Sequence, residues 1–420
     1  MAIFCYDYLI WARGRFIRLS MPVLPFVFYA LVGWVVKKAA GRVVFGRGYA
    51  DTGRLFGVRG SKWFETMTAQ LDFRLGAAKG RMIRIALAPG KTSMRVLVTG
   101  SAGHLGEALV RTLRDLKHEV VGLDILASPF TTQVGSISDR TFVRRCMKGM
   151  QNVFHAATLH KPHVATHSRQ AFIDTNVTGT LNLLEEAVAA GVGAFVYTST
   201  TRVFGGALIP PAGAPAAWIT EDVTPIPKNI YGVTKAAAED LCQLFHRNQR
   251  LPCIVLRTSR FFPEEDDNEE VRAAYSDDNL KANEYLYRRV EIEDVVSAHL
   301  LALRRAPAIG FRKYIVSATT PFLPDDLAAL RLDVPRVVRQ RVPGYESEYQ
   351  RRGWKMFSFV DRVYVNERAR RELGWKPRYD FAHIIDRMKS GENVRSSLAQ
   401  TIGSKGYHPA TFSHRPYPVA

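Results

Sequence analysis

The stretch MRVLVTGSAGHLGEALVRTLRDLKHEVVGLD, residues 94–124, decides the fold that the sequence predicts. The apolar run at 96–98 indicates a buried parallel strand, and a second apolar run at 120–123 ends on Asp124. Between the two runs, glycines follow a TGxxGxxG spacing and apolar residues recur at the helical interval. A strand, glycine turn, helix, strand and acid within about 30 residues is the order of a dinucleotide-binding unit.

Each part of this stretch has a physical role in binding a phosphate-bearing cofactor. Gly100 allows the tight turn after the strand, Gly103 leaves room for a pyrophosphate, and Gly106 lets the helix pack close to the sheet. The helix N-terminus offers free N–H groups and a partial positive charge to the phosphates. Asp124 is placed to accept hydrogen bonds from an adenosine ribose. Because no Arg follows it closely, we expect NAD rather than NADP.

After Asp124, the sequence alternates short apolar runs with helical patterns, including a long pattern over 171–190 and another over 230–245. This alternation predicts an α/β fold, a Rossmann-like doubly wound parallel sheet with a smaller C-terminal substrate-binding lobe. The expected organisation is an N-terminal extension at 1–93, an NAD-binding domain at 94–256, a substrate lobe with returning Rossmann elements at 257–385 and a C-terminal tail at 386–420.

The segment Tyr231-Gly-Val-Thr-Lys235 lies on a predicted helix and carries candidate chemistry. Residues four apart share a helix face, so the phenol and the ammonium point the same way. A phenol with a pKa of about 10 is a poor base at neutral pH, but a nearby ammonium and a positively charged nicotinamide favour the phenolate. Tyr231 then exchanges a proton with a substrate hydroxyl while a hydride moves. Thr200, or its neighbour Ser199, is expected to bind the same oxygen.

These motifs, in this order, resemble the extended short-chain dehydrogenases/reductases of the NAD-dependent epimerase/dehydratase type, a family that includes UDP-glucose 4-epimerase. The resemblance covers about Met94 to Phe381 and rests on seven pieces. They are VTGSAGHLG at 98–106, Asp124, VFHAAT at 153–158, NVTGTLNLLEEA at 176–187, FVYTSTTRVFG at 195–205, YGVTK at 231–235 and VNERARRELGWKPRYDF at 365–381.

The resemblance implies a role for individual residues and NAD as the cofactor. Thr200, Tyr231 and Lys235 match the catalytic triad of the family. Ser136 and Ile137 match the pair that contacts adenine, although an acid is more usual at the first of these positions. The implied cofactor-binding set is Gly100, Gly103, His104, Leu105, Gly106, Asp124, Ser136, Ile137, Ala156, Ala157 and Asn176.

The substrate side departs from the family pattern. Arg260 stands where sugar-nucleotide epimerases commonly carry Asn, and Tyr287 and Glu291 replace an Arg and a His of the usual Arg-x-x-x-His-Val-x-Asp-Val segment. Arg260, Arg288 and Arg289 are still candidates for bidentate binding of an anionic substrate. A role as surface or ion-pair arginines stays open for all three.

Three functions are compatible with these residues. The first is NAD-dependent oxidation, reduction or epimerisation of a hydroxyl-bearing carbon, with a nucleotide sugar as the first candidate substrate. The second is an NAD(P)-dependent reductase or dehydrogenase of a non-sugar carbonyl compound, which fits the departures in the lobe. The third is a dinucleotide sensor or scaffold, which has no need of the proton-transfer set. A small-molecule substrate and no nucleic acid are the expected partners, and a homodimer is an open possibility.

No metal site is predicted. Six carboxylates within 263–270 are typical of a solvated loop. Four histidines, at 155, 160, 163 and 167, lie close together, but Pro162 interrupts the spacing that a zinc site on a helix would need. The four cysteines form no CxxC pair, which favours buried thiols in a reducing compartment.

Residues 1–93 differ from the rest of the chain. They carry 15 Lys and Arg against 4 Asp and Glu, so more than half of the net charge of +19 lies there. Residues 19–36 form an uncharged stretch of 18 residues, which is the lower length limit for a membrane span. Two prolines in this stretch make a helix less favourable. Three interpretations stay open: a start assigned too early, with Met94 as the true start, a weak membrane anchor, or an ordered subdomain. We expect a cytoplasmic protein, associated with a membrane if this segment is an anchor.

Overall fold

The computed structural model describes residues 6–12, 15–21 and 93–406. The chain divides into two units, residues 1–89 and 90–420. In the first unit, β1 (Tyr6–Ala12) pairs antiparallel with β2 (Arg15–Met21). The apolar segment 19–36 extends beyond β2 into residues that the structure does not describe. Within the described ranges, no helix is long and apolar enough to cross a membrane.

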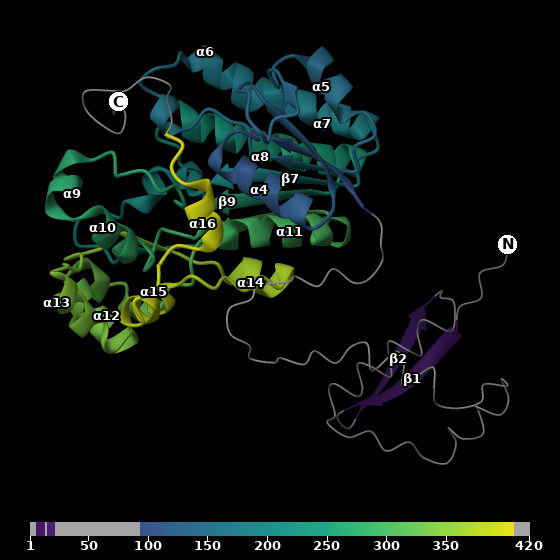
Figure 1. Ribbon diagram of the computed structural model, residues 1–420. Coiled ribbons are helices and arrows are strands. Elements are labelled where there is room, and N and C mark those ends of the chain that lie inside the picture. The colour runs from purple at the N-terminus through teal and green to yellow at the C-terminus, as the bar shows by residue number, and fades with distance from the viewer. Residues whose placement is uncertain (1–5, 13–14, 22–92, 407–420) are drawn as a thin grey trace. The chain divides into compact units, whose positions relative to one another are not determined.

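The second unit is built on a seven-stranded parallel sheet, which confirms the predicted Rossmann-like α/β class (Figure 1). β3 lies between β4 and β6, so the order of the strands along the chain reverses beside β3. Open α/β sheets bind their ligands at such a reversal, outside the carboxyl ends of the strands. In spatial order the strands are β10 (Phe311–Val316), β9 (Cys253–Thr258), β7 (Ala194–Thr200), β6 (Asn152–His155), β3 (Arg95–Thr99), β4 (Glu119–Asp124) and β5 (Gln133–Val134).

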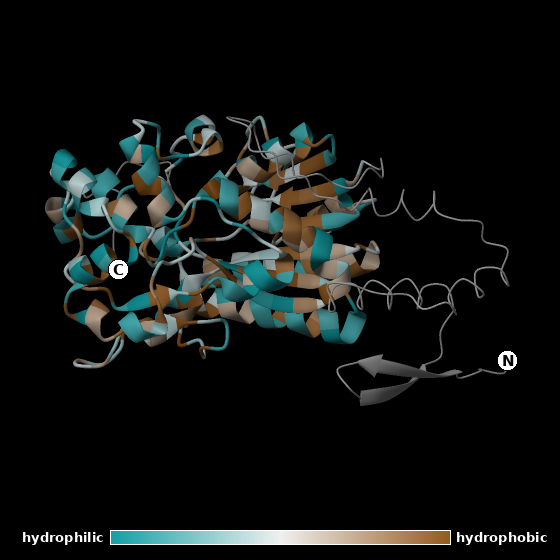
Figure 2. Cartoon of the chain, turned by 90° about the horizontal axis from the view of Figure 1, so that it is seen from below, coloured by the Kyte–Doolittle hydropathy of each residue, from teal (hydrophilic) through white to brown (hydrophobic). Residues whose placement is uncertain are grey.

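Helices cover both faces of this sheet because successive strand side chains point to opposite faces. Val96 and Val98 of β3 join one apolar cluster, whereas Leu97 between them joins the other. Figure 2 shows the apolar residues gathered along the sheet and the inner sides of its helices. The first cluster is covered by α4 (His104–Asp115), α11 (Ile292–Ile309), α14 (Glu367–Leu373) and α16 (Ser397–Ile402), and the second by α5 (Arg140–Met147), α7 (Gly179–Ala189) and α8 (Ile230–Gln249).

The helix predicted over 171–190 is not continuous. α6 (Arg169–Phe172) is followed by a π-helical turn, η2 (Ile173–Thr178), and only then by α7. The wider turn coincides with Asn176, which is buried and hydrogen-bonded on its side chain. Such turns inside α-helices occur frequently at functional sites.

The lobe has an apolar core of its own, which includes Tyr287, Tyr379 and Phe381. Two short parallel strands, β8 (Ala217–Ile219) and β11 (Arg362–Tyr364), lie beside this core and bring segments far apart in sequence together. The helices of the lobe are α9 (Glu269–Ala274), α10 (Asp277–Glu284), α12 (Val334–Arg341), α13 (Tyr345–Arg352) and α15 (Phe381–Lys389).

Candidate active site

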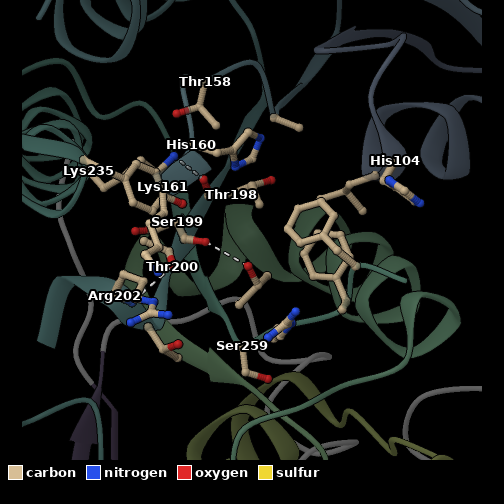
Figure 3. A pocket seen from close by; sticks show the side chains of 18 of the residues that line it. His104, Thr158, His160, Lys161, Thr198, Ser199, Thr200, Arg202, Lys235 and Ser259 are labelled. Carbon is tan, nitrogen blue, oxygen red and sulfur yellow. Dashed lines mark hydrogen bonds between the residues drawn. The ribbon is translucent and has the colours of Figure 1, made fainter. Parts of the chain in front are cut away.

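A cavity lies at the carboxyl ends of β3, β6, β7 and β9 and reaches the lobe. The glycine loop at 100–106 lines one part of it, and Thr200, Tyr231 and Lys235 line another. Figure 3 shows His104 across the cavity from Lys235 and Thr200. The lobe contributes Arg288, Arg362 and Tyr364 to the lining. The cavity therefore joins the predicted cofactor loop to the predicted proton-transfer residues.

The glycine loop has little space for side chains at the positions that the sequence singles out. Gly100 has a φ of +73°, and a Cβ there would lie 2.7 Å from the backbone nitrogen of Ala157. A Cβ on Gly106 would lie 1.8 Å from the carbonyl oxygen of Gly100. Gly103 is exposed and precedes α4, whose N-terminus has no side-chain cap. The loop and the uncapped helix end thus fit a dinucleotide pyrophosphate.

Asp124 lies at the end of β4, next to the glycine loop. Its Oδ2 accepts a hydrogen bond of 3.0 Å from the backbone nitrogen of Ala102, and its Oδ1 accepts one of 3.0 Å from Leu126. Ile137 is buried, and its carbonyl accepts a hydrogen bond of 3.0 Å from Asn182 Nδ2. In the described part of the chain, Asp124, Ser136 and Ile137 do not line the cavity. Their roles toward a ribose and an adenine stay predictions.

Tyr231 and Lys235 lie on one buried face of α8, as the four-residue spacing predicts. Asn229 caps this helix by accepting a hydrogen bond of 3.1 Å from the Gly232 nitrogen, which fixes where the face begins. The side chains of Tyr231 and Thr200 are hydrogen-bonded to each other. Lys235 Nζ donates to the Thr198 carbonyl oxygen at 2.6 Å. The three predicted catalytic residues therefore meet at the end of β7.

The two candidate hydroxyls at this strand end have different surroundings. Ser199 Oγ donates a hydrogen bond of 2.6 Å to Glu239 Oε1, whereas Thr200 faces Tyr231. Glu239 is buried and also accepts from Arg257 Nη2 at 2.7 Å and lies 3.1 Å from Lys313 Nζ. This geometry favours Thr200 as the hydroxyl that acts with Tyr231. A signal for the ion pair existed in the sequence, because Arg257 is a charge within an apolar strand.

Burial controls the acidity of the site. It raises the pKa of Tyr231 to about 12, although the hydrogen bond from Thr200 and the Arg202 charge act against this rise. We expected Lys235 to favour the phenolate, but in the chain without a cofactor the pKa of the Tyr231 phenol lies above its usual value. Burial also lowers the pKa of Lys235 to about 7, with Glu239 opposing the fall.

The three candidate substrate arginines surround a single buried carboxylate, Glu284. Arg288 Nη2 lies 2.7 Å from Glu284 Oε1, Arg289 Nη1 lies 2.8 Å from Oε2, and Arg260 Nη1 lies 3.5 Å from Oε1. Burial would raise the pKa of Glu284, but the charges of Arg288, Arg260 and Arg289 hold that pKa at about 2. Arg260 and Arg288 also line the cavity, whereas Arg289 donates to the Phe262 carbonyl oxygen at 2.6 Å. Arg289 therefore has the ion-pair role that the sequence left open.

The acidic run at 263–270 is not simply a solvated loop, and that prediction was wrong for Glu264 and Asp266, which are both buried. Asp266 pairs with Arg260 at 2.5 Å. Glu264 Oε1 accepts hydrogen bonds from Ser404 Oγ and from the next two backbone nitrogens at 2.9–3.1 Å. His104 Nε2 lies 2.7 Å from the Gly403 carbonyl oxygen. We call residues 403–406 the C-terminal segment; it joins the acidic run to the start of α4.

Asn176 is not among the described residues that line the cavity, but its side chain connects two elements next to it. Its Oδ1 accepts hydrogen bonds from Thr158 Oγ1 at 2.9 Å and from the Leu159 nitrogen at 2.8 Å. Its Nδ2 donates to Thr234 Oγ1 at 3.1 Å, so the side chain links the end of β6 to α8. Residues 156 and 157 directly follow β6, and Ala156 lines the cavity.

The histidine-rich stretch supplies one residue that sequence reasoning did not assign to the site. His160 lines the cavity, and its ring centroid lies 6.1 Å from that of Tyr231. Burial lowers the pKa of His160 to about 3, so the ring is neutral. His155 is buried between Thr99 Oγ1 at 2.8 Å and Thr180 Oγ1 at 2.9 Å. Within residues 6–12, 15–21 and 93–406, no group of three or more His, Cys, Asp or Glu side chains could hold a metal ion.

Residues 96–315 match the model of the NAD-dependent epimerase/dehydratase family. The chain belongs to this family. It is therefore an enzyme of a family whose cofactor is NAD, and the glycine loop and uncapped α4 described above fit that cofactor. The other NAD-site residues keep their predicted roles as expectations.

Among curated relatives, the chain is 28% identical over 362 residues to a 3-beta-hydroxysteroid dehydrogenase of Mycolicibacterium neoaurum, covering 75% of this chain and 95% of the relative. It is 26% identical over 333 residues to a UDP-glucose 4-epimerase of Streptomyces lividans, covering 70% of this chain and 95% of the relative. A solved short-chain dehydrogenase/reductase superfamily protein from Agrobacterium tumefaciens, with bound NAD, aligns with a TM-score of 0.52 at 24% identity. That alignment covers 70% of this chain and 96% of the solved chain, and it supports the fold.

Proposed function

We propose that this enzyme oxidises and reduces a hydroxyl-bearing carbon of a nucleotide sugar, with Tyr231 exchanging the hydroxyl proton. One observation carries the proposal: Tyr231, Thr200 and Lys235 meet at the end of β7 in the cavity that the glycine loop also lines. A dinucleotide sensor would need the loop but not the three polar side chains. The similarity to the Streptomyces epimerase along most of its length supports the choice of substrate.

Each residue of the set has a defined task in this proposal. When bound, NAD would supply the nicotinamide that accepts a hydride and can return it. Tyr231 holds or accepts the proton of the substrate hydroxyl, and Thr200 orients the phenol through their hydrogen bond. Arg202 places positive charge near the phenol, which favours the phenolate, and Lys235 donates a hydrogen bond to the Thr198 carbonyl oxygen at the same strand end. Burial of Tyr231 and Lys235 keeps water away from the transfer.

A second function has its own support. The similarity to a 3-beta-hydroxysteroid dehydrogenase favours an NAD(P)-dependent dehydrogenase or reductase of a non-sugar carbonyl compound. The same proton-transfer residues serve both reactions, so the site chemistry alone does not separate them. Cofactor behaviour separates them: an epimerase recycles the NAD that it retains, whereas a dehydrogenase consumes exchangeable NAD(P).

The test begins with a thermal-shift screen of UDP- and GDP-sugars in the presence of NAD, because a ligand that binds the folded state raises the melting temperature. Turnover of any sugar that stabilises the protein is then measured in Tyr231→Phe and in the control Tyr345→Phe, whose hydroxyl lies in the lobe. We expect Tyr231→Phe to lower kcat by roughly 10²–10⁴-fold while NAD binding is retained. Unchanged turnover in Tyr231→Phe would contradict the mechanism, and no stabilisation by any nucleotide sugar would favour the dehydrogenase.

A further inference from the structure

Two guanidinium groups approach one aromatic ring on the lobe side of the cavity. The Cζ atoms of Arg288 and Arg362 lie 5.4 Å and 5.8 Å from the centroid of the Tyr287 ring. The ring is buried, and the Tyr364 nitrogen donates a hydrogen bond of 3.1 Å to the Tyr287 carbonyl oxygen. This backbone contact fixes β11, and Arg362 with it, beside the turn that carries Arg288. Stacking on an aromatic face holds a guanidinium in place with little loss of its hydrogen-bonding capacity.

The two arginines differ in their partners. Arg288 is paired with Glu284 at 2.7 Å, and Asp266 lies 3.5 Å away. Arg362 forms no ion pair with the residues that the structure describes, whereas Arg288 does, and the buried Nε of each of the two arginines has no hydrogen-bond partner there. The adjacent Asp361 instead pairs with Arg331. Burying a guanidinium N–H without an acceptor is unfavourable. An acceptor from outside the chain would remove that cost.

Cationic side chains outnumber acidic ones among the described residues that line the cavity, although Lys161, Arg260 and Arg288 are each paired with a carboxylate. This excess indicates the charge of that acceptor. The only acidic side chain among the described lining residues is Asp267, and it is paired with Lys161. Among the cations, Arg202 follows Thr200 closely on η3 (Thr201–Phe204) and lies near enough to Tyr231 to affect the pKa of its phenol. Positive charge thus extends from the proton-transfer residues to the lobe. The cationic lining side chains are Lys161, Arg202, Lys235, Arg260, Arg288 and Arg362.

We propose that Arg362, seated on Tyr287 beside Arg288, binds an anionic group of the substrate and selects charged hydroxyl compounds over neutral ones. The group is a carboxylate or a phosphate, since both offer the paired oxygens that a guanidinium binds through two parallel hydrogen bonds. This inference rests on the proposed function in one respect: it takes the cavity as the substrate site. Arg362 is not one of the three candidate substrate arginines at 260, 288 and 289, and its role here would exclude an uncharged steroid as the preferred substrate.

Binding of three small probes tests the inference in the full-length, NAD-loaded protein. The probes are UDP for a phosphate, D-galacturonate for a carboxylate and D-galactose as the neutral counterpart, each measured by isothermal titration. We expect at least one anion to bind the wild type more tightly than galactose does. Arg362→Gln should weaken that binding by roughly tenfold or more, the effect of losing a hydrogen bond to a charged group. The anion that loses affinity identifies the source of the charge.

Arg336→Gln is the matched control, because the Arg336 guanidinium is exposed on α12 and Arg336 is not among the described residues that line the cavity. It should bind each probe as the wild type does. Equal affinity for anions and galactose in the wild type would overturn the inference, and so would an Arg362→Gln variant that binds the anion unchanged. If Arg362→Gln fails to fold, the wild-type comparison still decides. Turnover lost in Tyr231→Phe with unchanged anion binding in Arg362→Gln would retain the proposed function and reject this inference alone.

Discussion

Glu239→Gln tests how far the proton-transfer residues depend on the ion pair behind them. The carboxylate is 1% exposed and Arg257 is 2% exposed, and they meet at 2.7 Å. Removing one partner of a buried pair costs about 3–5 kcal/mol, because the other charge stays buried and unpaired. An unfolding entropy of about 2.1 cal/mol/K per residue gives about 0.7 kcal/mol/K for the second unit, so the melting temperature should fall by about 4–7 °C.

The control is Glu119→Gln, which breaks an exposed pair with Arg95 in which both side chains are over 40% exposed. Such pairs contribute about 0–1 kcal/mol, so calorimetry should show a fall of about 1.5 °C or less. Glu239 also raises the pKa of Lys235, so its loss should move the alkaline limb of the kcat/KM profile to lower pH. A melting temperature no lower than that of the control would refute the reasoning, as would an unmoved alkaline limb.

Three further predictions concern the same unit. Gly106→Ala should abolish NAD binding in titration, since its Cβ would meet the Gly100 oxygen at 1.8 Å, whereas Gly193→Ala should bind normally; equal affinities would contradict this. The pKa of Lys235 falls to about 7 on folding, so wild-type stability should rise from pH 7 to pH 10 and stay constant below pH 7, where the residue is charged in both states. Urea denaturation across this pH range should show no such rise in stability for Lys235→Met. Stability that changes with pH in the same way in the wild type and the variant would contradict this prediction. A chain ending at Ile402 should bind NAD more weakly because it loses the contacts of the C-terminal segment to His104 and Glu264; unchanged affinity would disprove that link.

The features that could be predicted from the sequence are those that depend on residues close together in the chain. The strand, glycine turn and helix at 94–124 depend on neighbours a few residues apart, and the strand-helix alternation then leads to the parallel sheet. The four-residue spacing of Tyr231 and Lys235 placed them on one face of α8 before the fold was known. The catalytic and cofactor roles, the domain boundaries, the homodimer and the cytoplasmic location stay predictions.

The features that could not be predicted depend on which distant segments meet. The burial of Glu264 requires the C-terminal segment, which contacts His104 across 299 positions in the sequence. The convergence of three arginines on Glu284 likewise requires Arg260, which follows β9, to reach the turn that carries Arg288 and Arg289. A run of charged residues in a sequence does not show which of them will be paired and buried. The acids at 264 and 266 therefore could not be told apart from the solvent-exposed acids beside them.

The contacts of the C-terminal segment can form only late in synthesis of the chain, because this segment is translated long after the glycine loop and α4. The ribosome releases the glycine loop and α4 early, but the carbonyl of Gly403 and the ammonium of Lys405, which lies 2.5 Å from Glu107, emerge about 300 residues later. At about 5–20 residues per second, that interval lasts roughly 15–60 seconds. During it, the nascent sheet can form while the start of α4 lacks its final covering. We therefore expect the nascent chain to acquire its full affinity for cofactor only after residue 406 has left the ribosome.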